Sequence, residues 1–109
     1  MYGTSEMRKV YLTSTEEEAV ETLGRRVRAA RLRRNLSQED LAERAGVTRK
    51  TIAALEAGEA GVSVGVLAKA LYILGYPDRL AGLLETDPIG EDLETGRQRA
   101  GRREGVAPF

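Results

Sequence analysis

Apolar residues recur at helical spacing along most of the first 85 positions of the chain. Over 14–35 they stand three or four positions apart, which places them on one face of a helix that ends near Asn35. The residues of this stripe are Ala19, Leu23, Val27 and Ala30. Ser14 and Glu17 have the spacing of a capping box, so we expect the helix to begin near Ser14 or Thr15.

Two shorter helices are predicted next, over 38–45 and 49–57. Ser37 and Thr48 precede them, and a side-chain hydroxyl at that position accepts from a free backbone N–H of the first turn. Gly46 stands between the helices, where the chain must turn and a positive φ is needed. The apolar residues expected to pack the pair together are Leu41, Ala45, Val47, Ile52 and Leu55. The pattern is that of a helix-turn-helix, whose second helix enters the major groove of DNA.

Two further helices are predicted between Ser63 and residue 85. Ser63 is the expected N-cap of the first, which ends at Gly75, and Pro77 begins the second. Their apolar residues are Val64, Leu67, Ala70, Leu71, Leu74, Leu80, Leu83 and Leu84. The alternation over 9–13 is typical of a short strand.

These elements divide the chain into three parts. We expect an N-terminal lead-in over 1–13 and an all-α domain of five helices over 14–85. The segment 86–109 is polar and rich in Arg and Gly, so it is expected to be a flexible tail.

Charge is distributed unevenly, although the formal net charge at pH 7 is zero. Residues 24–50 carry nine basic and three acidic side chains, whereas residues 51–96 carry two basic and eight acidic ones. The local potential, rather than the net charge, governs attraction to phosphate. Some arginines of the basic segment are therefore expected to contact phosphates, with a solvated helix face as the alternative: Arg25, Arg26, Arg28, Arg31, Arg33 and Arg34.

The composition argues against catalysis and against a metal site. His and Cys are absent, which removes the commonest general base and the commonest ligands of transition metals. The carboxylates do not converge on an apolar pocket, so we expect neither an enzyme nor a cofactor. No apolar run reaches the roughly 20 residues that span a membrane, and we expect a cytoplasmic protein without membrane contact.

The stretch SQEDLAERAGVTRKTIAALEAG resembles the helix-turn-helix domain of the lambda-repressor-like, Xre-type family, and the similarity extends over residues 23–84. The resemblance implies a compact five-helix bundle that binds, as a homodimer, a double-stranded DNA operator with two half-sites. It places Gln38 where the family holds a glutamine that touches the DNA backbone or a base near it. It also implies that Glu56 belongs to the scaffold rather than to the DNA-binding surface.

The same resemblance assigns roles at the start of the second helix of the motif. Arg49 and Lys50 stand at base-reading positions, and both side chains can reach guanine O6 and N7. The alternative for this pair is contact with phosphates alone. Thr48 and Thr51 stand where side chains meet phosphates or base edges. With Arg34 from the basic segment, the expected DNA-binding residues are Gln38, Thr48, Arg49, Lys50, Thr51 and Arg34.

A weaker resemblance lies in the flanks. Asp87-Pro88-Ile89-Gly90, followed by an Arg-rich tail that ends in Phe109, is similar to antitoxins of HipB type. Such proteins repress their own operon and bind a HipA-type kinase toxin. The resemblance implies that Arg102, Arg103 and Phe109 bind a kinase-like toxin, and the alternative is a tail without a role.

Apolar residues between 71 and 84 outnumber those that a short two-helix segment needs for one small core. Some are expected to face a second copy of the chain, with purely internal packing as the alternative. The residues expected at this dimer interface are Leu71, Tyr76, Leu80, Leu83 and Leu84.

The predicted function is that of a sequence-specific DNA-binding transcriptional regulator. The full hypothesis is an autorepressor that is also the antitoxin of a HipA-type toxin-antitoxin pair. One alternative is a stand-alone repressor of phage or restriction-modification type. Another is a protein-bridging helix-turn-helix module that reads no sequence.

Overall fold

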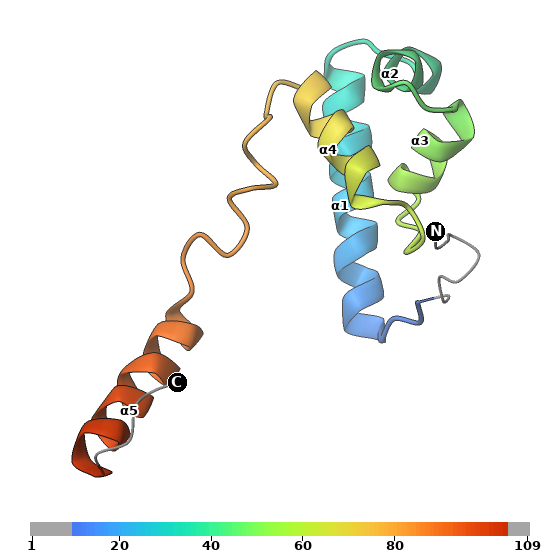
Figure 1. The fold of residues 1–109 in the computed structure, drawn as a ribbon. Coiled ribbons are helices and arrows are strands. Elements are labelled where there is room, and N and C mark those ends of the chain that lie inside the picture. The colour runs from blue at the N-terminus through green and yellow to red at the C-terminus, as the bar shows by residue number, and fades with distance from the viewer. Residues whose placement is uncertain (1–9, 105–109) are drawn as a thin grey trace, which may run out of the picture.

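Five α-helices make up the computed structural model, which describes the backbone of residues 10–104 and the side chains of residues 10–100 (Figure 1). They are α1 (Ser14–Arg33), α2 (Gln38–Ala45), α3 (Arg49–Glu56), α4 (Val64–Ile73) and α5 (Pro88–Glu104). The predicted all-α class is confirmed. The strand expected over 9–13 is wrong for residues 10–13, which form no regular element, and residue 9 lies outside the described residues.

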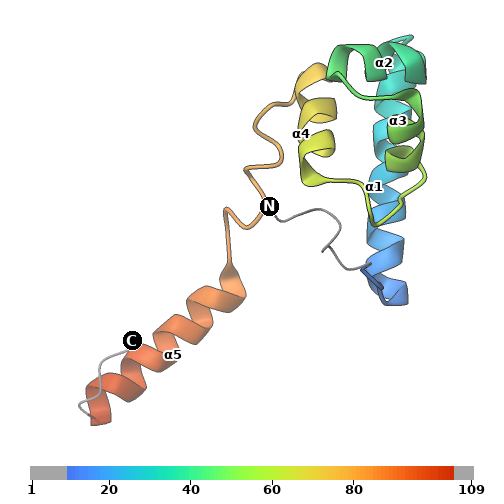
Figure 2. The ribbon, with the colours of Figure 1, turned by 45° about the vertical axis from the view of Figure 1, so that its right-hand side comes forward.

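A single core joins α1, α2, α3 and α4. α4 packs against α2, and α3 packs against both α1 and α2 (Figures 1 and 2). Leu41 of α2 and Ile52 of α3 are fully buried at the centre of this contact. The other members of the core cluster are Val27, Ala42, Leu55, Ala70 and Leu74. The core therefore draws on all four helices.

The α2–turn–α3 unit forms as the pattern of caps and glycine predicts. Ser37 Oγ accepts from the Asp40 N–H, and Asp40 Oδ2 accepts from the Ser37 N–H, both at 2.9 Å. Gly46 follows α2 with a φ of 73°, in the left-handed region that glycine adopts without steric cost. Thr48 and Ser63 are the N-caps of α3 and α4, as expected.

The start of α1 is correct, but its cap lies one residue earlier than expected. Thr13 Oγ1 accepts from the Glu16 N–H at 3.3 Å, and Glu16 Oε1 accepts from the Thr13 N–H at 2.9 Å. The stripe predicted along α1 is only partly buried. Val27 lies in the core, whereas Ala19 and Leu23 are exposed, because the other helices cover only the C-terminal half of α1 (Figure 1).

The helix expected from Pro77 to Leu84 is wrong. Residues 77–85 form separate turns, in which Gly82 N donates to Asp78 O and Leu83 N donates to Leu80 O, each at 3.2 Å. Leu84 has a φ of 66°, which no helix accommodates. Leu83 and Leu84 are exposed, so this segment buries no apolar face against which a short helix would be stable.

The fifth helix lies instead in the segment 86–109, which was expected to be flexible. Asp87 caps α5, because its Oδ1 accepts from the Gly90 N–H at 3.0 Å, and Pro88 occupies the first helical position. Both views show α5 well away from α1–α4 (Figures 1 and 2). The Cα radius of gyration is 19.2 Å, against about 13 Å for a compact domain of this length.

We predict that Gly24→Ala destabilises the fold, because α1 and α3 approach most closely at this glycine. A Cβ at residue 24 would lie 2.5 Å from Glu56 O and 2.7 Å from Leu55 O, and backbone atoms cannot move aside cheaply. The free energy of unfolding in urea should fall by about 1–3 kcal/mol. Gly61→Ala is the control, since a Cβ there meets nothing within 4 Å. Equal stability of the two variants would contradict the close approach.

Candidate nucleic-acid interface

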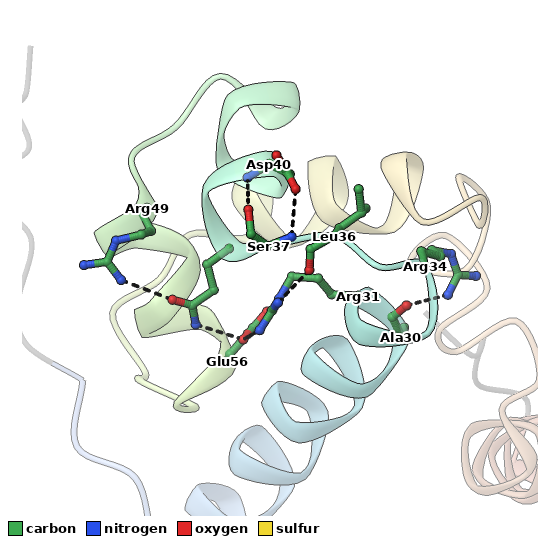
Figure 3. Close-up of polar contacts among 9 residues, drawn as sticks. Ala30, Arg31, Arg34, Leu36, Ser37, Asp40, Arg49 and Glu56 are labelled. Atoms are coloured by element: carbon green, nitrogen blue, oxygen red, sulfur yellow. Dashed lines mark hydrogen bonds and ion pairs between the residues drawn. The ribbon is translucent and has the colours of Figure 1, made fainter.

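A buried ion pair joins the C-terminal part of α1 to the end of α3. Arg31 Nε donates to Glu56 Oε2 at 2.6 Å, and Arg31 Nη2 donates to Glu56 Oε1 at 2.9 Å (Figure 3). Arg31 and Glu56 are only 5% and 7% exposed. Arg31 Nη1 also donates to Leu36 O at 2.8 Å, which fixes the loop before α2. Arg31 is therefore buried in the scaffold and is not among the arginines of the basic segment that are exposed to phosphate, while Glu56 is buried in the scaffold as expected.

The same ion pair extends to the protein surface through Gln38, the first residue of α2. Gln38 Nε2 donates to Glu56 Oε1 at 3.0 Å, and Gln38 Oε1 accepts from Arg49 Nη1 at 3.3 Å. Arg49 is exposed at the first position of α3. A continuous chain of hydrogen bonds thus runs from the core to the start of the second helix of the motif (Figure 3).

Glu56 is held in its charged form by this arrangement. Burial alone would raise the pKa of the carboxyl. The hydrogen bonds from Arg31 and Gln38, together with the positive charges of Arg31 and Arg28, outweigh burial and lower the pKa. Arg28 is exposed, and its charge is the smallest of these contributions to the lowered pKa of Glu56.

The remaining predicted residues at the start of α3 lie beside Arg49 in the chain. Thr48 Oγ1 accepts from the Thr51 N–H at 3.1 Å, and the two hydroxyls are 2.9 Å apart. Thr48 and Lys50 are exposed and Thr51 is half-buried. The structure therefore gathers five of the six predicted DNA-binding residues at the N-terminal ends of α2 and α3.

Arg34 is the exception. Arg34 Nη1 donates to Ala30 O at 2.7 Å, and its guanidinium lies 6.0 Å from the centre of the Tyr76 ring. Figure 3 shows Arg34 and Arg49 well apart, beyond opposite sides of the Arg31–Glu56 pair. Arg34 is thus remote from the cluster around Arg49.

The residues predicted at a dimer interface differ in exposure. Leu71 and Leu80 are half-buried, whereas Tyr76, Leu83 and Leu84 are exposed. Tyr76 stacks on the Arg79 guanidinium, which lies 4.1 Å from the ring centre. The sequence pattern missed Tyr72, whose side chain is also exposed on α4. Of the residues predicted to bind a partner, Arg102 and Arg103 fall within α5, and Phe109 lies outside the described residues.

Comparison with known families agrees with this geometry. Residues 27–79 match the family model described as helix-turn-helix, a range that contains Arg31, Gln38, Arg49 and Glu56. These residues form a helix-turn-helix domain of the Xre and lambda-repressor-like family. The presence of this domain supports the assignment of the chain as a DNA-binding transcription regulator. No curated protein and no solved structure matches the chain. Within the described residues, no helix is long and apolar enough to cross a membrane.

We predict that acid destabilises the helix-turn-helix domain through Glu56. The folded pKa of Glu56 is lowered, so its stabilising charge is fully present above the ordinary pKa of 4.5. That stabilisation is lost as the pH falls through the lower, folded pKa. Asp40 acts in the same direction, because its bonds to Ser37 lower its pKa. Urea unfolding between pH 7 and pH 3 should show the decline, and Glu56→Gln should make it shallower.

We predict that an unpaired Glu56 carboxylate destabilises the domain more than the loss of both charges of the ion pair does. Arg31→Met leaves the Glu56 carboxylate buried without its cation, which should cost about 3–5 kcal/mol in the free energy of unfolding. Arg31→Met with Glu56→Met removes both charges and should recover most of that loss. If the double variant is as unstable as the single one, the burial of an unpaired charge is not the cause.

Proposed function

We propose that the chain is a sequence-specific transcriptional regulator that binds an operator as a homodimer and represses its own transcription. The observation that carries the proposal is the orientation of Arg49. This exposed side chain is hydrogen-bonded to Gln38, which is itself anchored on buried Glu56. A base-reading side chain held before DNA arrives loses less conformational entropy on binding than a mobile one.

Arg49 retains the groups that it needs for base recognition. Its bond to Gln38 uses one N–H of Nη1, and a guanidinium carries five N–H donors. The remaining donors suit guanine, whose O6 and N7 accept in the major groove. Lys50 follows directly and can reach the same edge. The proposal therefore includes a preference for G·C pairs in each half-site.

Other side chains would position the domain on the DNA backbone. The hydroxyls of Thr48 and Thr51 lie at the N-terminus of α3, where backbone N–H groups and the helix dipole favour an anionic phosphate. Arg28 is an exposed cation on α1 whose charge acts on Glu56. Contacts of this kind give affinity and register without reading the base sequence.

Two copies of the domain would occupy the two half-sites. The proposed contact surface is the exposed apolar region after α4 that includes Tyr76, Leu83 and Leu84, with half-buried Leu71 and Leu80 at its edge. Tyr72 extends this region onto α4.

The resemblance of the flanks to HipB-type antitoxins supports a narrower proposal. In it, Arg102, Arg103 and Phe109 bind a kinase-like toxin while the domain binds DNA. The position of α5 favours this arrangement, because the helix stands apart from α2 and α3 (Figure 1). A partner on the tail would then leave the DNA-binding surface free.

Binding to the DNA upstream of its own gene tests the main proposal. The wild-type chain should bind this duplex much more tightly than a scrambled one, and affinity should fall steeply with added salt. Arg49→Ala should lose about 1–3 kcal/mol of discrimination between the two duplexes. Arg34→Ala is the matched control and should keep that discrimination. Equal, weak binding of the wild type to both duplexes would contradict sequence reading and favour a protein-bridging module.

A further inference from the structure

α5 exposes an apolar stripe that the rest of the described chain does not cover. Ile89 and Leu93 are 76% and 61% exposed, and four positions apart they share one face of the helix. α5 is only 17 residues long. Gly90, Gly96 and Gly101 lower its helix propensity. A helix of this length and composition is marginal in water on its own, so packing of its apolar face would stabilise it.

The stripe continues along α5 in the register of a coiled coil. Ile89, Leu93, Gly96 and Ala100 stand at alternating intervals of four and three positions. The two large side chains fall in the N-terminal half of the helix and the two small residues in the C-terminal half. Large residues can therefore pack on small ones only if a partner helix of the same sequence runs in the opposite direction.

Charge also differs between the two halves of α5, as side-chain size does. The residues before its middle include the acidic Asp87, Glu91, Asp92 and Glu94. After it stand the basic Arg97, Arg99, Arg102 and Arg103, with Glu104 as the last residue. Two copies in parallel would bring acidic groups next to acidic groups and basic groups next to basic groups. Two antiparallel copies would bring opposite charges together.

We propose that α5 pairs antiparallel with α5 of a second copy of this chain. In the register that aligns the stripe, Ile89 packs against Ala100 of the second copy and Leu93 against its Gly96. The same register places Asp92 beside Arg99 of the second copy, at positions that flank the seam. Each of these contacts occurs twice because the pair has a two-fold axis.

This inference goes beyond the proposed function, because the pairing requires no DNA. Its apolar contact is small, so the two helices alone associate weakly. Two domains bound to neighbouring half-sites would hold the two α5 helices at a high effective concentration and so favour the pair. The pairing would in turn strengthen operator binding by the two domains together.

Disulfide formation tests both the contact and its direction in the full chain, which has no native cysteine. Ile89→Cys and Ala100→Cys chains, mixed and oxidised, should form a mixed disulfide dimer. Neither variant should cross-link with itself, because in the antiparallel pair its two cysteines lie eleven residues, about 16 Å, apart along the helices. A disulfide needs a Cα separation of about 4.4–6.8 Å. Gln98→Cys, on the opposite side of the helix, is the control and should not cross-link.

Sedimentation measures the same contact without a cross-link. Leu93→Asp should weaken self-association about tenfold or more, because it places a charge in the seam twice. Gln98→Asp adds the same charge away from the seam and should associate like the wild type. Unchanged thermal unfolding of α1–α4 would show that both variants keep the folded domain.

Three results would overturn the proposal. A wild-type chain that stays monomeric at every concentration and gives no mixed disulfide would show that α5 has another partner or none. Self-cross-linking of Ile89→Cys as fast as the mixture would show that the helices are not antiparallel. Equal association of Leu93→Asp and wild type would exclude the stripe as the contact. None of these measurements includes DNA, so they stand apart from a failure of operator binding.

Discussion

The buried ion pair of Arg31 and Glu56 is the interaction on which the residues proposed to contact DNA depend. Removing two charges from water costs several kcal/mol per ion, and hydrogen bonds recover that cost only when the groups are fully satisfied. Here Arg31 also binds Leu36 O, Glu56 also binds Gln38, and no buried side-chain nitrogen or oxygen of the described residues lacks a partner. Buried ion pairs in general add little net stability compared with well-packed apolar residues. The value of this pair is geometric, because one carboxylate orients residues from α1, α2 and, through Gln38, the start of α3.

Local chemistry made the helix-turn-helix unit predictable from sequence. Ser37 and Thr48 each cap the helix that follows them, and Gly46 alone supplies the positive φ between α2 and α3. Signals of this kind depend on neighbours three or four positions away, so they can be read along the chain. The cluster of Gln38, Arg49 and Lys50 follows from them, because the caps set where each helix begins.

Features that depend on distant contacts were not predictable in the same way. Arg31 is one of a run of arginines, and only the approach of Glu56, 25 positions later, distinguishes it from its exposed neighbours. Arg34 belongs to the same run of arginines but lies near Tyr76. The prediction of a helix at Pro77 was wrong because it, too, depends on contacts with distant residues. Its leucines have helical spacing, but Leu83 and Leu84 find no surface to pack against, and period alone does not form a short helix.

If the chain acts as proposed, the composition of α3 explains why two copies of the domain separate operator from other DNA better than one. Arg49 and Lys50 are the long polar side chains at its start, while Ala53 and Ala54 offer only methyl groups. At about 1–3 kcal/mol for each good base contact, one domain discriminates by roughly 2–6 kcal/mol. Specific regulators separate operator from other DNA by about 4–10 kcal/mol. Two domains on two half-sites reach that range, so any contact that holds two copies together, including a pair of α5 helices, contributes directly to the reading of DNA.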